Sequence, residues 1–211
     1  DTVFFDAQPK ETVTTSQFRI TLAQAIIAVW VIGMALSAVK LLIARLKFNR
    51  MIQHCSIAPA KRILKIYEKC CNDLNIRHPL PIRIITGVFS PVITISMCPQ
   101  IILPYDICIE LTDEQLIHTI AHELTHYRRR DHLLSLLLRL LEIVYWFNPI
   151  VWLLKREIVK DMECACDSFV TAAYDKANRR EYALTLLKLF SQPQKNSYMS
   201  VSYTHLTLPT T

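Results

Sequence analysis

His122, Glu123 and His126 form the pattern H-E-x-x-H in the segment HELTH. On a helix, residues four apart lie on one face with Cβ atoms about 6 Å apart, so the two imidazoles can hold one metal ion. Glu123 adjoins the first histidine and is placed to take a proton from a metal-bound water. The pattern predicts one Zn²⁺ per chain that activates water for hydrolysis. The alternative is a helix that merely exposes two histidines.

A catalytic zinc ion needs a third protein ligand and a position open to water. We favour Glu163, in the segment DMECACD, because a carboxylate from a separate helix completes a His, His, Glu set. Asp167, one turn later, can accept the free N–H of a ligand imidazole. A solvated acidic face is the alternative for this pair, and Cys164 and Cys166 are expected to be core thiols. The other candidates, expected to be exposed, to cap the helix or to lie behind the ligands, are His118, Asp131 and His132.

These residues require helices to position them. Thr112 and Gln115 form a capping box that opens a helix running to about Arg130. The apolar segment 133–154 either crosses the membrane or forms a buried hairpin. Pro149 disfavours helical geometry at the preceding residue, so we expect two helices meeting at a bend near 147–149. Further helices are expected over 155–169 and 179–190.

Residues 20–39 form an uncharged apolar run, ITLAQAIIAVWVIGMALSAV. The run is long enough to cross the hydrocarbon core of a bilayer as a helix. The positive charges that follow it, before the first acid at Glu68, place the downstream side in the cytoplasm. These charges are Lys40, Arg45, Lys47, Arg50, Lys61, Arg62 and Lys65.

Between the run and the capped helix, two changes of pattern occur. Apolar residues at helical spacing predict an amphipathic helix over 56–74, lying near the membrane. Short β-rich runs over 79–104, punctuated by Gly87 and prolines, predict a small sheet. The expected organisation is an external loop over 1–19, a transmembrane helix over 20–47, a cytosolic-facing domain over 48–190 and a disordered or non-native tail over 191–211.

The composition excludes several classes of protein. Gly33 and Gly87 are the two glycines of the 211 residues, so glycine-rich phosphate-binding loops are excluded. The seven cysteines are odd in number, contain no C-x-x-C and all follow the apolar run, which favours reduced thiols over a disulfide framework. We interpret the net charge of +6 as arising from basic residues that set the membrane topology and contact lipid headgroups. Nucleic acid is not an expected partner, because no basic stripe with interspersed aromatic residues occurs.

Three segments in this order, HELTHYRRRDH, YWFNPIVWLLKRE and DMECACD, make residues 20–190 resemble the membrane-embedded zinc metallopeptidases of the BlaR/MecR type. The resemblance implies an α+β, mainly helical fold: a gluzincin-like domain with a small β-sheet, attached to transmembrane helices. It implies His122, His126 and Glu163 as zinc ligands, Glu123 as catalytic base and Asp167 as a residue behind the ligands. It also implies a substrate-aligning edge strand, formed by Val92, Ile93, Thr94, Ile95 and Ser96.

We therefore expect a membrane-bound zinc metalloendopeptidase, multi-pass in the full-length protein, that acts in signal transduction by self-cleavage or repressor cleavage, as in β-lactam sensing. Because the chain starts at Asp1, we expect it to be a fragment. The expected partners are the lipid bilayer and a substrate, which is the protein's own loop, a repressor or a membrane protein. A homodimer is left open. Tyr127, Tyr145, Tyr174 and the arginines are candidates for stabilising the oxyanion.

Three alternatives remain. A membrane protease of the HtpX or CAAX-processing type shares the H-E-x-x-H pattern, although the FNP and DMECACD segments argue against it. A non-hydrolytic signalling module would hold zinc with no position open to water. A basic membrane anchor that docks partners would bind no metal.

Overall fold

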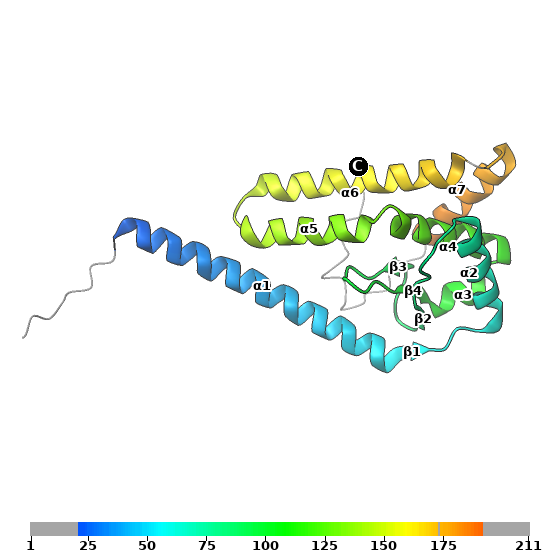
Figure 1. Ribbon diagram of the computed structural model, residues 1–211, viewed down its shortest axis with the longest axis horizontal. Coiled ribbons are helices and arrows are strands. Elements are labelled where there is room, and N and C mark those ends of the chain that lie inside the picture. Colours follow the sequence, from blue (N-terminus) through cyan, green and yellow to red (C-terminus); the bar gives the residue numbers. More distant parts are fainter. Residues whose placement is uncertain (1–20, 173, 192–211) are drawn as a thin grey trace, which may run out of the picture.

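The computed structural model describes residues 21–172 and 174–191, and Figure 1 shows its elements. The helices are α1 (Leu22–Cys55), α2 (Lys61–Asp73), α3 (Tyr105–Glu110), α4 (Asp113–Arg128), α5 (Asp131–Val144), α6 (Pro149–Ala172) and α7 (Lys176–Ser191). The strands are β1 (Ser56–Ile57), β2 (Ile82–Ile85), β3 (Val92–Ile93) and β4 (Ile101–Pro104). The fold is α+β and mainly helical, which confirms the expected class. The predicted external loop and nearly all of the predicted tail lie outside the described residues.

Helix α1 begins with a capping box in which Thr21 and Gln24 each accept a hydrogen bond from the other's backbone N–H. The helix has 34 residues, which is about 50 Å at 1.5 Å per residue. It continues past the predicted end at residue 47, because no helix-breaking residue occurs before Ser56. Within the described part of the chain, α1 is the helix long and apolar enough to cross a membrane.

The sheet has the strand order β1-β2-β4-β3, with β2 and β4 parallel and the outer pairs antiparallel. The predicted small sheet is therefore present. Its edge strand is shorter than expected and contains only Val92 and Ile93. The backbone N–H of Thr94 still bonds to the backbone oxygen of Gln100, but the ladder ends there because the Thr94 hydroxyl accepts the backbone N–H of Gln100 in place of the backbone oxygen. These bonds fold the intervening residues, Ile95 and Ser96 included, into a loop.

Helix α2 packs its apolar face inward against α4. Ile63, Ile66 and Tyr67 on this face are buried in the main core with residues of β4 and α4. The amphipathic pattern was predicted, but its first residues are not helical. Ser56 pairs with Ile85 in the sheet instead, and α2 begins only after Pro59.

Helices α5 and α6 form a long hairpin that projects from the domain beside α1 (Figure 1). Arg130, in the left-handed region with φ 63°, turns the chain from α4 into α5. The predicted bend is present, because α5 ends at Val144 and Pro149 begins α6. Glu142 of α5 and Lys155 of α6 form an ion pair at 2.7 Å across the hairpin.

The tip of the hairpin contacts α1. Trp30 donates a hydrogen bond from Nε1 to the backbone oxygen of Val144 at 3.0 Å. Three residues further along α1, the ring of Trp146 lies directly on Gly33, where any Cβ would overlap it. Glycine is therefore required at position 33 for this close approach.

Candidate metal centre

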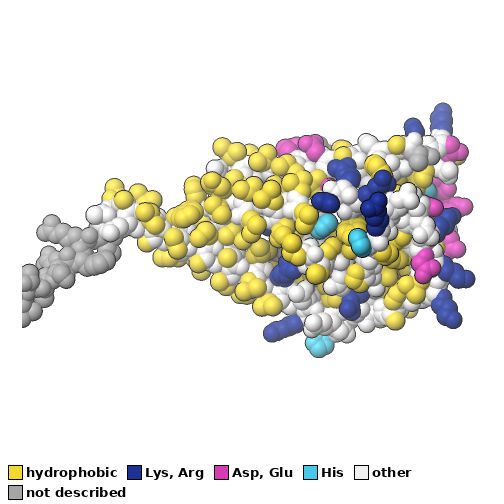
Figure 2. All heavy atoms as spheres, in the orientation of Figure 1, with side chains coloured by type: hydrophobic (Ala, Val, Ile, Leu, Met, Phe, Trp, Pro, Cys, Tyr) yellow, Lys and Arg dark blue, Asp and Glu magenta, His cyan; other side chains and the backbone are white. Residues whose placement is uncertain are grey.

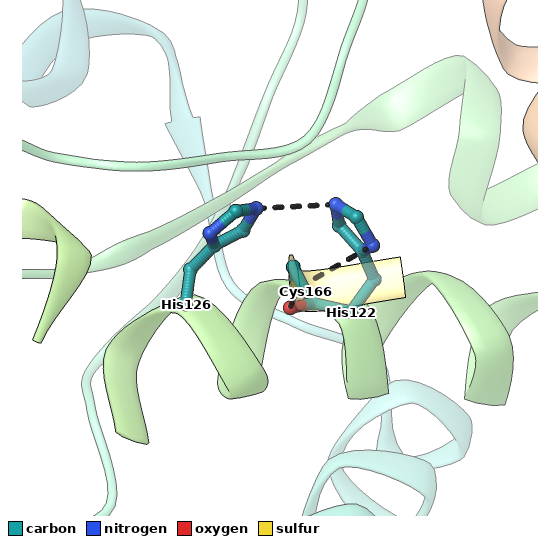
Figure 3. A group of neighbouring side chains, drawn as sticks. All are labelled: His122, His126 and Cys166. Atoms are coloured by element: carbon teal, nitrogen blue, oxygen red, sulfur yellow. Dashed lines mark hydrogen bonds between the residues drawn. The ribbon is translucent and has the colours of Figure 1, made fainter. Parts of the chain in front are cut away.

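The H-E-x-x-H residues lie on α4, which opens with the predicted capping box of Thr112 and Gln115. His122 and His126 project from the same side of the helix, and a nitrogen of one ring faces a nitrogen of the other (Figure 3). The two facing atoms are Nε2 of each residue, 3.2 Å apart. His122 is 9% exposed. The pair is therefore positioned as the spacing predicted.

The second nitrogen of each ring faces an acceptor. Nδ1 of His126 lies 2.8 Å from Oδ2 of Asp131. Nδ1 of His122 lies 2.7 Å from the hydroxyl of Tyr182 and 3.2 Å from Oδ1 of Asp167. Tyr182 in turn donates to that same carboxylate oxygen at 2.7 Å. These partners place a proton on each Nδ1, so that each ring, in the neutral form that binds a metal, directs the lone pair of its Nε2 toward the other ring.

The carboxylate of Glu163, on α6, faces both lone pairs. Oε2 is 3.5 Å from Nε2 of His122, and Oε1 is 3.6 Å from Nε2 of His126. Zinc bonds of about 2.0–2.2 Å to nitrogen and oxygen give tetrahedral edges of about 3.3–3.6 Å between donors. The three separations, two of which involve different oxygens of the Glu163 carboxylate, are of similar size at 3.2–3.6 Å. The two imidazole nitrogens and the carboxylate are all electron-pair donors, so a cation bound between them would interact favourably with all three.

Cys166 offers another donor. His122, His126 and Cys166 place ligand atoms within 4.8 Å of one another. Figure 3 shows these three side chains. The Cys166 thiol donates to the backbone oxygen of His122 at 3.3 Å, and its sulfur is 3.7 Å from Nδ1 of that residue. This nitrogen is the one occupied by Tyr182 and Asp167, whereas Glu163 faces the free Nε2 atoms. The geometry therefore favours Glu163 as third ligand and leaves Cys166 within reach.

The charges at the centre shift the pKa values of its groups strongly. Burial alone would lower the pKa of His122, but hydrogen bonds with Asp167, Cys166 and Glu163 outweigh burial and raise it. For His126, too, burial would lower the pKa, but hydrogen bonds with Cys166 and Glu163 outweigh burial and raise the pKa to about 11. Burial would raise the pKa of Glu163, yet the two histidines lower it to about 2. The negative potential that holds protons here would equally hold a divalent cation.

Glu123 lies among these groups, but burial has the larger effect on its pKa. Burial raises its pKa, and the positive charge of His122 and His126 only partly opposes the shift. A carboxylate whose pKa is raised toward neutrality accepts a proton more readily than an ordinary glutamate. The environment therefore suits the general base predicted at this position.

The structure separates the remaining candidates for the third ligand from the centre. His118 contacts the hydroxyl of Tyr174 at 3.1 Å from Nδ1. His132 stacks on the ring of Tyr127 with centroids 5.6 Å apart. Cys164 is exposed. Asp131 is close to the centre, but as the acceptor for His126.

Tyr182 contacts His122 and Asp167 at the centre, although the sequence did not point to it. It lies on α7, 60 positions from His122, and no local motif links the two. The helix predicted over 179–190 includes Tyr182, but the sequence did not indicate its contact with His122. The tyrosines proposed for the oxyanion did not include it.

The predicted substrate strand lies beside α4, because β3 contacts that helix. Val92 and Ile93 form the outermost strand of the sheet. In the loop that follows, Arg45 of α1 donates to the backbone oxygen of Ile95 at 3.1 Å and to Oγ of Ser96 at 3.0 Å. The membrane-anchor helix and the edge of the sheet are thus directly joined.

A helical domain with an apolar anchor helix, a histidine–carboxylate cluster of metal-binding geometry and an adjacent sheet edge has the features of a membrane-associated peptidase. The sequence matches the family model of the BlaR1 peptidase M56 over residues 3–207, and the chain belongs to this family.

Three known proteins show the similarity. The regulatory protein BlaR1 of Bacillus licheniformis is 33% identical over 188 residues, which cover 86% of this chain and 31% of that protein. The methicillin resistance mecR1 protein of Staphylococcus aureus (strain Mu50 / ATCC 700699) is 25% identical over 103 residues, 49% of this chain and 18% of that protein. The regulatory protein BlaR1 of Staphylococcus aureus is 30% identical over 87 residues, which cover 41% of this chain and 15% of that protein. The chain thus spans about a third or less of the length of these relatives.

Proposed function

We propose that the chain is the zinc metalloendopeptidase part of a membrane-bound regulatory protein. The observation that carries the proposal is the convergence of His122, His126 and Glu163, whose facing atoms lie 3.2–3.6 Å apart. Each Nδ1 is held from behind, by Asp131 or by Tyr182 with Asp167, which is how metal-binding imidazoles are oriented. The family membership supports peptide hydrolysis as the reaction.

In this mechanism His122, His126 and Glu163 hold the ion. Zinc, when bound, supplies Lewis acidity, which polarises a peptide carbonyl and acidifies water. Glu123 takes the proton of the attacking water on its carboxylate and later gives it to the leaving amine. Its buried surroundings, which raise its pKa, favour both transfers. Tyr182, through its hydroxyl, would keep the proton of His122 on Nδ1 and so leave Nε2 of that residue free to bind the ion.

The substrate would bind as an extended strand along the edge formed by Val92 and Ile93. β3 pairs with β4 on one side and lies next to α4, so a strand added at this edge passes near the centre. Main-chain pairing of this kind gives affinity with little demand on sequence. The relatives' names indicate regulation and resistance. We infer a protein substrate in signal transduction: the protein's own loop, a repressor or a membrane protein.

Helix α1 would anchor the domain in the cell membrane with its catalytic face in the cytoplasm. The support is the apolar length of the helix and the excess of basic residues after it. We also propose that the full-length protein is multi-pass, as the resemblance to the BlaR/MecR type implies.

The test compares the detergent-purified chain with Glu123→Gln and, as a matched control, Glu114→Gln. Glu114 lies on the same helix and is exposed. We expect about one zinc ion per chain in all three proteins. We expect self-cleavage fragments of the chain, detected by mass spectrometry, in the parent and the control alone. Cleavage by Glu123→Gln, or loss of its zinc, would contradict the role assigned to Glu123.

A second function, a non-hydrolytic module with structural zinc, is favoured by one observation. Cys166 lies within ligand distance of both histidines, and with Glu163 it would close the site with four protein donors. X-ray absorption at the zinc edge distinguishes the two functions. A sulfur ligand in the parent that disappears in Cys166→Ser supports the structural site, and nitrogen and oxygen ligands alone support the peptidase.

A further inference from the structure

The hairpin of α5 and α6 carries a large apolar surface that no described element covers. Figure 2 shows this surface continuing into that of α1, on the half of the molecule away from most of the charged side chains. Six large apolar residues on it are each between 51% and 68% exposed: Leu137, Leu140, Phe147, Ile150, Trp152 and Leu153. A surface of this kind marks a contact with a partner or a membrane.

The hairpin turn bonds backbone groups within itself, although the indole nitrogen of Trp146 is buried without a partner among the described residues. Asn148 donates its backbone N–H to the oxygen of Tyr145, and its side chain accepts from the backbone of Ile150 at 3.0 Å. Two of the charges near the tip, Glu142 and Lys155, neutralise each other at 2.7 Å, whereas Arg156 and Glu157, which follow on α6, are exposed. Internal satisfaction of backbone groups is the condition for placing a turn in hydrocarbon. A turn that faced water would not need it.

The contacts with α1 fix the depth of the hairpin. Its tip touches Trp30 and Gly33, which lie near the middle of the uncharged run 20–39. The 14 residues of α5 extend about 20 Å from the tip, beyond the 15 Å half-thickness of the core. They therefore reach headgroup level at Asp131, where exposed Arg128 and Arg130 adjoin the helix.

We propose that α5 and α6 form a re-entrant hairpin, inserted in the cytoplasmic leaflet beside α1, with acyl chains covering its apolar faces. The tip lies near the bilayer midplane and does not cross it, since α5 is too short to span the core. The metal centre, at the base of the hairpin, is then held at the headgroup surface. The inference depends on α1 being a membrane helix and not on hydrolysis.

The test uses the three tryptophans of the chain. The whole chain, Trp152→Phe and Trp30→Phe are reconstituted in vesicles of phosphatidylcholine and phosphatidylglycerol. The phosphatidylcholine carries bromine near the carbonyl, midway along or at the end of its acyl chains. The emission lost in each variant reports on the replaced tryptophan, and Trp30 serves as the positive control for insertion of α1. Equal helix content by circular dichroism shows that the substitutions preserve the fold.

We expect bromine midway along the chains to quench the Trp152 emission about twofold more than aqueous iodide does, as for a group inside the hydrocarbon core. Quenching by iodide but not by bromine would place the hairpin in water and overturn the inference. Quenching by neither would mean that protein, such as a second copy of the chain, covers the hairpin, and would overturn it equally. Zinc-free protein should give the same result, so failure here is distinguishable from failure of the peptidase proposal.

Discussion

The hydroxyl oxygen of Tyr182 lies 2.7 Å from Nδ1 of His122 and 2.7 Å from Oδ1 of Asp167. Because the hydroxyl donates to the carboxylate, its oxygen is free to accept the N–H of the imidazole. The arrangement fixes the tautomer of His122 from α7, an element that supplies no ligand itself. The orientation of His122, the proposed metal ligand on α4, thus depends on the docking of α7.

Replacing Tyr182 with Phe should weaken zinc binding about tenfold, as measured for groups that orient ligand imidazoles. The variant removes one hydroxyl and keeps the ring that packs with Cys166 and Val170. Competition with a chelating dye measures the affinity. Tyr174→Phe is the matched control, since its hydroxyl bonds to His118, and it should bind zinc as the parent does. An equal loss in both variants would contradict the role of Tyr182.

Glu163→Gln should weaken zinc binding by more than about 100-fold, beyond the range seen for groups behind the ligands. The amide keeps the size of the side chain but removes the charge that faces both Nε2 atoms. Equilibrium dialysis with metal analysis measures the loss. Glu157→Gln, on the exposed face of the same helix, should leave affinity unchanged. Parent-like affinity in Glu163→Gln would assign the third ligand elsewhere, with Cys166 the nearest donor.

Zinc uptake near neutral pH should release about two protons per ion, because ligand imidazoles must be neutral. Both histidines have a raised pKa, about 11 for His126, so each holds a second proton in the metal-free protein. Their ion pairs stabilise the metal-free fold fully below the pKa of an unfolded histidine, and this stabilisation is lost as pH rises toward 11. Calorimetry in buffers of different ionisation enthalpy counts the protons. A count near zero would show neutral imidazoles before binding.

Gly33→Val should destabilise the contact between α1 and the hairpin by about 1–3 kcal/mol, the usual cost of overpacking. Any Cβ at this position overlaps the ring of Trp146, so the ring or one of the two elements must shift. Thermal unfolding in detergent, followed by tryptophan emission, measures the effect. Ala35→Val places the same side chain on an exposed position of the same helix and should be neutral. Equal stability of the two variants would show that the contact is loose.

Features encoded within a few residues were predictable. The capping box at Thr112 and the spacing of His122 and His126 specify a helix and a shared face, and the structure has both. Pro149 likewise predicts the bend between α5 and α6. The role of Asp131 was left open although it is only five residues from His126. The Asp131 carboxylate reaches His126 only because the chain makes a left-handed turn at Arg130. No pattern in the sequence predicts that turn.

Features that depend on distant parts of the chain were not predictable. Tyr182 reaches His122 only because α7 folds back on α4, and its position in an ordinary helical pattern gave no signal. The edge strand was predicted through Ser96, yet the pairing ends at Thr94, whose hydroxyl accepts the backbone N–H of Gln100 in place of its backbone oxygen. The start of the helix predicted over 56–74 was also wrong, because Ser56 finds a partner strand 29 positions away at Ile85.

The order of the ligands along the chain has a consequence for assembly. His126 and Glu163 are separated by residues 127–162, and these contain all of α5 and the first half of α6. A cation bound by both side chains is therefore a cross-link that closes this loop, worth about 4 kcal/mol of chain entropy by the loop-closure relation. The closed loop is the apolar hairpin itself, so its two ends can meet only once the hairpin has folded. Metal capture would then follow membrane insertion during biogenesis, and a loaded centre would report that the hairpin is in place.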